Sequence, residues 1–73
     1  MDQILDMLKR EYPLIDFENE KHLMSKGRLD SLAVVGIIAN LEEMFDISVT
    51  MEYIRPENFE SVEAMWNMVQ ELQ

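Results

Sequence analysis

The chain has 73 residues, 48% of them hydrophobic, which is enough to build one domain over residues 1–73 and leaves no room for a second. Fifteen Asp and Glu against six Lys and Arg give a net charge of −9, which disfavours nucleic acid and anionic membranes as partners because both attract cationic proteins. The absence of Cys excludes a disulfide scaffold, a thiolate metal site and a protein thiol nucleophile.

The first predicted element is a helix over residues 2–12, where apolar side chains recur at helical spacing and Asp2 is a candidate cap. Pro13 ends it, because proline disfavours the helical conformation in the residue before it. Residues 13–30 show neither helical nor strand periodicity, so we expect a long ordered loop that lies over the helices. Six apolar side chains are its expected anchors: Leu14, Ile15, Phe17, Leu23, Met24 and Leu29.

The strongest helical pattern covers residues 31–45, which contain no proline and follow a candidate N-cap at Asp30 or Ser31. The large apolar side chains form one stripe that we expect to be buried: Val34, Ile37, Ile38, Leu41, Met44 and Phe45. The opposite face combines apolar, very small and acidic side chains: Leu32, Val35, Gly36, Ala39, Glu42 and Glu43. This combination would let the surface of another protein approach closely.

The rest of the chain is predicted to hold two further helical segments. Residues 46–50 are a linker anchored by Ile47 and Val49, and residues 51–59 are expected to hold a short helical turn on either side of Pro56. Ser61 then caps a final helix that ends near residue 72. The expected fold is therefore all-α: a small four-helix bundle of three main helices plus one short helix, with a long first loop.

Patterns for catalysis and metal binding are weak. His22 is the single His, and without Cys it completes neither a nucleophilic dyad nor a zinc site. Asp16, Glu18 and Glu20 alternate like calcium ligands, but Lys21 stands where such a loop requires glycine. We therefore expect no catalytic residue, no enzyme and no EF-hand or other built metal site, while weak cation binding at the surface stays open. No apolar run approaches the ~20 residues of a membrane span, and the first residues do not begin a signal peptide, so we expect no membrane insertion and a cytoplasmic location.

Ser31 admits two interpretations. A serine at the start of a helix is usually a cap and nothing more. Alternatively its hydroxyl is esterified, since a phosphate there would meet unpaired backbone N–H groups and the positive end of the helix dipole. Charge is uneven around it: residues 29–73 hold nine acids and only one base, Arg55. Such asymmetry favours capture of basic partners, but it also serves solubility.

Two groups of residues in the central helix carry a family resemblance: Asp30-Ser31-Leu32 at its start, and Glu42-Glu43 with Phe45-Asp46 near its end. In a short acidic chain this arrangement resembles the acyl carrier protein superfamily, and the order of helices and loops agrees over nearly the whole chain. The resemblance implies an acyl-carrier-like fold and a carrier rather than an enzyme. Ser31 would receive 4′-phosphopantetheine from coenzyme A through a phosphopantetheinyl transferase, with Asp30 and Leu32 as recognition residues.

The resemblance also implies partners and cargo. The thiol of the arm would hold an acyl or aminoacyl group as a thioester, loaded by a ligase and passed to an acyltransferase or synthase of fatty-acid or secondary-metabolite biosynthesis. These enzymes would dock on a monomer at five residues of the central helix: Val35, Gly36, Ala39, Glu42 and Glu43. The form Gly27-Arg28-Leu29-Asp30-Ser31-Leu32, with Pro56-Glu57-Asn58-Phe59 downstream, looks closer to D-alanyl and other specialised stand-alone carriers, which favours an aminoacyl or pathway-specific cargo. The alternative is a small acidic interaction module or inhibitor that docks on a basic surface while Ser31 stays unmodified.

Overall fold

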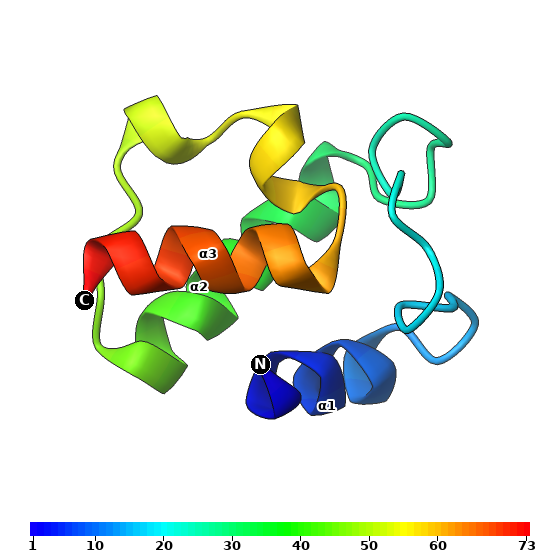
Figure 1. The fold of residues 1–73 in the computed structure, drawn as a ribbon, viewed down its shortest axis with the longest axis horizontal. Coiled ribbons are helices and arrows are strands. Elements are labelled where there is room, and N and C mark those ends of the chain that lie inside the picture. Colours follow the sequence, from blue (N-terminus) through cyan, green and yellow to red (C-terminus); the bar gives the residue numbers. More distant parts are fainter.

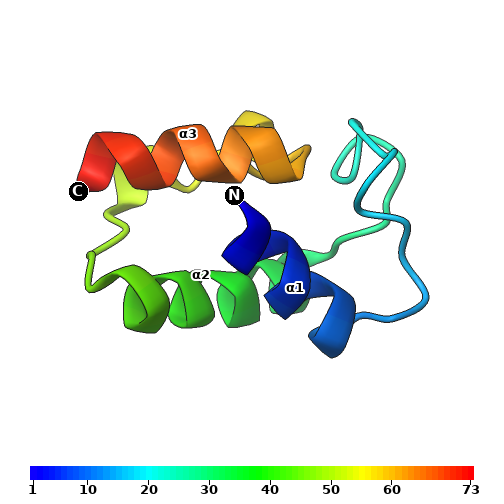
Figure 2. The same ribbon diagram turned by 60° about the horizontal axis from the view of Figure 1, so that its bottom comes forward.

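The computed structural model describes residues 1–73 and contains three α-helices, two short 3-10 helices and no strands. In chain order these are α1 (Asp2–Glu11), α2 (Ser31–Phe45), η1 (Met51–Tyr53), η2 (Pro56–Phe59) and α3 (Val62–Leu72). Helices α2 and α3 run in the same general direction, and α1 and η2 both pack against α3 (Figures 1 and 2). The predicted all-helical class is confirmed. None of the helices has the length and apolar character needed to cross a membrane.

One hydrophobic cluster holds the elements together, and no polar or charged side chain is buried in it. Where α2 meets α3, the rings of Phe45 and Trp66 pack with their centroids 5.9 Å apart. Each α-helix contributes a stripe of buried side chains: Ile4, Met7 and Leu8 from α1; Val34, Ile37 and Leu41 from α2; and Val62, Met65, Met68 and Val69 from α3. The segments between the α-helices complete the core with Phe17, Leu23, Leu29, Ile47, Val49 and Phe59. Burial of apolar side chains on this scale is the main force that keeps so short a chain folded.

The predicted buried stripe of α2 is confirmed for Val34, Ile37 and Leu41, while Ile38 and Phe45 are partly buried. The prediction that Met44 is buried is wrong, because this residue is 38% exposed. Met44 shares its direction around the helix with the buried Ile37, but it lies in the last turn of α2, which ends at Phe45.

The helix ends follow the capping residues closely. The predicted bounds of α2 are confirmed, and Asp46 ends the helix in the left-handed conformation with φ 52°. Ser61 caps α3 as predicted, since its Oγ accepts a hydrogen bond from the amide of Ala64 at 3.0 Å. The prediction that Asp2 caps the first helix is wrong. Asp2 is the first residue of α1, the N-cap position is Met1, and no side chain caps that end.

The long loop between α1 and α2 is anchored by three of its six predicted residues, because Phe17, Leu23 and Leu29 are buried. Ile15 and Met24 are partly buried. Leu14 is wrong as an anchor, because it is 98% exposed. The amide of Ile15 donates to the carbonyl of Tyr12 at 3.2 Å, so Leu14 lies at the outside of a tight turn and points into solvent.

The segment between α2 and α3 holds the expected short helical turns around Pro56 as two 3-10 helices, one before it and one that begins at it, so the count of one short helix was one too few. Pro56 separates them, since proline has no N–H to continue a helix and is well suited to the first position of a new one. It is the first residue of η2. The linker anchors are confirmed, with Ile47 and Val49 9% and 8% exposed.

Candidate functional site

Ser31 is the first residue of α2, and its side chain is exposed. The cap of this helix is made by Asp30, whose Oδ1 accepts a hydrogen bond from the amide of Ala33 at 2.8 Å. The hydroxyl of Ser31 is therefore not needed to hold the helix. The carbonyl of Asp30 accepts the first helical hydrogen bond, from the amide of Val34, and the amides of Ser31 and Leu32 precede it. Those two N–H groups stay available at the positive end of the helix.

An apolar groove begins at Ser31. It has a volume of about 310 Å³ and runs between the first turns of α2 and the segment that holds η2. In Figure 1 this segment (yellow) lies beside the start of α2. Most of its lining is apolar, and one charged residue joins it: Met24, Val34, Val35, Ile38, Ile54, Pro56 and Phe59, with Arg55. A covalent group attached to an exposed hydroxyl at the rim of an apolar groove can place its first atoms inside that groove.

A second cavity, of about 400 Å³, lies on the other side of the start of α2. Its lining includes Arg28, Asp30 and Leu32, but not Ser31. Leu32 is 83% exposed, so it stands beside Ser31 as a large apolar side chain in solvent. Asp30 and Leu32 thus lie on the side of this second cavity, whereas Ser31 between them lines the apolar groove.

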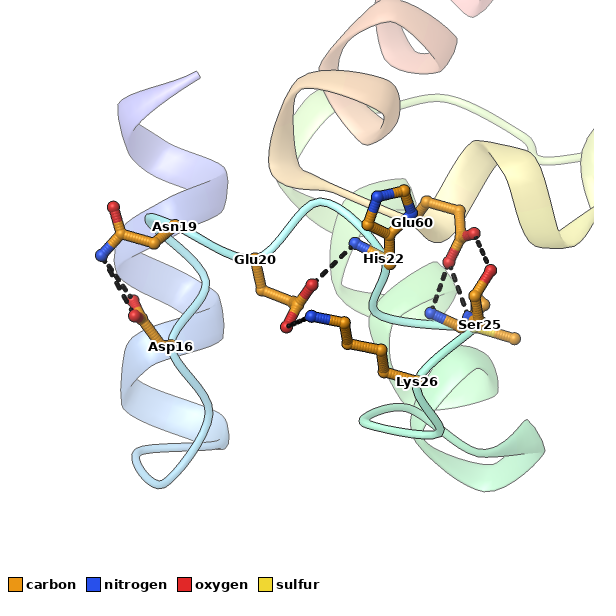
Figure 3. Close-up of polar contacts among 8 residues, drawn as sticks. Asp16, Asn19, Glu20, His22, Ser25, Lys26 and Glu60 are labelled. Carbon is orange, nitrogen blue, oxygen red and sulfur yellow. Dashed lines mark hydrogen bonds and ion pairs between the residues drawn. The ribbon is translucent and has the colours of Figure 1, made fainter.

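The loop before Ser31 is fastened to the start of α3 by Glu60 (Figure 3). The carboxylate of Glu60 accepts hydrogen bonds from the amides of Met24 and Ser25, at 2.6 and 2.9 Å, and from the Ser25 hydroxyl. The carbonyl of Glu60 also accepts from the amide of Leu23 at 2.9 Å. Donation by Ser25 is the main reason that the pKa of Glu60 is lowered. This contact joins two segments more than thirty residues apart and holds in place the loop that leads to Ser31.

The other polar residues of the loop pair locally and do not form a shared site. Asp16 accepts from the side-chain amide of Asn19 at 3.0 Å, and Glu18 pairs with Lys9 at 2.9 Å. Glu20 accepts from the amide of His22 at 2.9 Å, which is the main reason that its pKa is lowered (Figure 3). The alternating carboxylates of the sequence are therefore directed to three different partners.

The expected docking face of α2 is partly accessible. Leu32, Val35, Ala39 and Glu43 are exposed. Gly36 is half-buried, and a Cβ at this position would lie 3.3 Å from the hydroxyl oxygen of Tyr12. Glu42 is also half-buried, because its Oε2 accepts a hydrogen bond from the amide of Val49 at 2.9 Å and braces the linker after α2. The exposure expected of Gly36 and Glu42 is therefore reduced by contacts within the chain.

Sequence reasoning missed two residues that shape this site. Arg55 was visible only as the one base of residues 29–73, and its place in the groove depends on how η2 packs. Glu60 gave no signal in the sequence, because an isolated Glu before a helix has no distinctive spacing. Contacts between a loop and a distant helix start can be found only in the folded chain.

Comparison of this chain with protein-family models, with the curated proteins and with the solved structures gives no match. The geometry around Ser31 and the sequence pattern are therefore the grounds for a functional conclusion.

Proposed function

We propose that this chain is a carrier protein that holds an acyl or aminoacyl group as a thioester on a 4′-phosphopantetheine arm attached to Ser31. It shuttles that group between partner enzymes of a specialised biosynthetic pathway in the cytoplasm, as a monomer with a small acyl-carrier-like four-helix bundle. The observation that carries the proposal is the state of Ser31: an exposed hydroxyl at the first position of α2, freed from capping by Asp30, at the rim of an apolar groove.

The residues at the start of α2 fit the prosthetic group. The oxygen of Ser31 is accessible for esterification, and the amides of Ser31 and Leu32 can donate to a phosphate. When bound, the arm supplies the thiol that carries the acyl group. The chain has no Cys of its own, so this sulfur has to be imported. Asp30 keeps the helix start in place, and together with Leu32 it would be read by the phosphopantetheinyl transferase.

The exposed part of the α2 face supports docking of enzymes with apolar and basic surfaces. Leu32 and Val35 are 83% and 64% exposed, and the carboxylate of Glu43 stands on the same face. Large exposed apolar side chains next to a charge are typical of a surface that binds another protein. We propose that a transferase, a loading ligase and a downstream acyltransferase or synthase use this face in turn, through contacts weak enough to be released.

The proposal is tested by incubating the full chain with coenzyme A and a broad-range phosphopantetheinyl transferase, followed by intact mass spectrometry. We expect one phosphopantetheinyl increment on the wild-type chain and none on Ser31→Ala. Ser48→Ala is the matched control, because it removes another exposed serine away from the groove and should still be modified.

A wild-type chain that stays unmodified with several transferases would overturn the carrier proposal. The net charge of −9 would then favour the alternative function, a small acidic interaction module or inhibitor that docks on a basic surface. Modification that persists in Ser31→Ala would equally contradict the assignment, because the arm would then be attached elsewhere.

A further inference from the structure

Arg55 occupies an unusual position for a basic residue in this chain. It is the one Lys or Arg of residues 29–73, where nine acids lie, and it lines the same groove as Ser31. Its backbone is held on both sides: its amide donates to the carbonyl of Tyr53, and its carbonyl accepts from the amide of Asn58, each at 3.0 Å. The backbone of Arg55 is therefore fixed beside the groove, and its long side chain extends from that position.

The present partner of Arg55 is a weak one. Its Nε lies 3.5 Å from Oε1 of Glu57, and the two side chains are 56% and 65% exposed. Strong charge-assisted hydrogen bonds are about 2.7–2.9 Å long, and exposed ion pairs contribute little to stability. The planar guanidinium is suited to two parallel hydrogen bonds with an oxyanion, which this contact does not provide. A phosphate within reach can therefore compete with Glu57.

We propose that Arg55 is the positioning residue that binds the phosphodiester formed on Ser31, and that it exchanges Glu57 for the phosphate when the arm is attached. This inference rests on the proposed function of Ser31. The phosphodiester adds a negative charge to a region that already holds eight more acids than bases, and self-repulsion of this kind destabilises a folded chain. Arg55 is the base in this region that can offset it, because it lines the same groove as Ser31.

Arg28 is the competing candidate, since it lies three residues before Ser31. It lines the cavity on the other side of the helix start, with Asp30 and Leu32, and Ser31 does not line that cavity. Arg10 offers a neutral comparison: it is exposed on α1, and its nearest ion-pair partner is Glu11 at 4.0 Å. Replacing any of the three arginines by Gln removes the same charge, so differences between the variants report position rather than net charge.

The test compares unmodified and phosphopantetheinylated chains of the wild type, Arg55→Gln, Arg28→Gln and Arg10→Gln. We expect the ³¹P signal of the phosphodiester to shift in Arg55→Gln and to stay unchanged in Arg10→Gln. Attachment of the arm should lower the melting temperature of Arg55→Gln by about 2–5 °C more than that of the wild type at low salt. This difference should shrink in about 0.5 M salt, which screens the charges.

A second measurement needs no variant. In the wild-type chain, the Nε–H signal of Arg55 in a ¹⁵N correlation spectrum should move on modification, while that of Arg10 should not. If Arg28→Gln shifts the phosphorus signal and Arg55→Gln does not, the phosphate lies in the other cavity and the inference is wrong. A modified chain in which Arg55 gives no response also overturns it. Failure of the carrier proposal looks different, because the wild-type chain would not be modified at all.

Discussion

The hydrogen bond between Asp30 and Ala33 allows a direct test of how the start of α2 is held. Asp30→Ala removes the oxygen that accepts from the amide of Ala33 at 2.8 Å. Loss of such a cap costs about 1 kcal/mol, with a range of roughly 0.5–2 kcal/mol. In a domain of this size, 1 kcal/mol corresponds to about 4–8 °C in melting temperature. We therefore expect thermal melts followed by far-UV circular dichroism to show a fall of about that size.

Two further variants separate the cap from the charge. Asp30→Asn keeps an acceptor oxygen and caps about as well, but it loses the attraction of a carboxylate to the helix dipole, about 0.3–1 kcal/mol. Its melting temperature should fall between those of the wild type and Asp30→Ala. Ser61→Ala is the matched control, because it removes the equivalent cap of α3, where the amide of Ala64 donates at 3.0 Å. It should lose a similar amount of stability.

The same variants distinguish stability from recognition at Ser31. Under the proposed function, Asp30→Asn slows phosphopantetheinylation although the helix is still capped, whereas Ser61→Ala leaves the rate for folded protein unchanged. An Asp30→Ala chain that melts at the wild-type temperature would refute the capping argument, since the amide of Ala33 would then gain nothing from its partner. Equal modification rates in all three variants would remove Asp30 from the recognition residues.

Three further predictions concern the loop, the α2 face and the packing of Tyr12. The pKa of Glu60 is lowered below its ordinary 4.5 by hydrogen bonds from Ser25. Its stabilisation is therefore complete above that pH and lost as the pH falls through the lower folded-state pKa, so the difference in melting temperature between wild type and Glu60→Gln should shrink as the pH falls below 4.5. Gly36→Ala gains about 1 kcal/mol of helix propensity, but its methyl group meets the Tyr12 hydroxyl at 3.3 Å. The measured gain in unfolding free energy should be larger in a Tyr12→Phe background, and equal gains would contradict the contact. Val35→Glu should weaken transfer by a partner enzyme, whereas Leu14→Glu, at an exposed site away from this face, should not; both should keep the helical signal.

The parts of the fold that were predictable are those determined by local sequence. The bounds of α2 follow from a strong apolar period and a capping residue, and α3 follows from Ser61 and the spacing after it. Pro56 predicts short helical turns on either side of it, and the segment holds one 3-10 helix before Pro56 and another that begins at it. Such signals act over a few residues, so they determine where a helix begins and ends independently of how the rest of the chain packs.

The errors arise where packing decides. Leu14 and Met44 are large apolar residues, and composition alone favours burying both, yet Leu14 lies in a tight turn and Met44 in the last turn of α2, and both are exposed. The exposed position of Ser31 could be expected from its place at a helix start. The groove beside it could not, because Met24 and Arg55 reach it from segments whose positions depend on tertiary contacts.

Several of the acidic side chains are not available to a docking partner, because their carboxylates accept hydrogen bonds from backbone amides of this chain. Asp30 caps α2, Glu42 holds the amide of Val49, and Glu60 fastens the loop to α3. On the expected docking face this leaves Glu43 as the exposed acid, beside apolar residues such as Val35. Burial of apolar surface grows with contact area and is insensitive to screening, whereas a single exposed ion pair is worth little in salt. The proposed docking on this face therefore depends chiefly on apolar contact, and the net charge of the chain contributes to attraction at a distance.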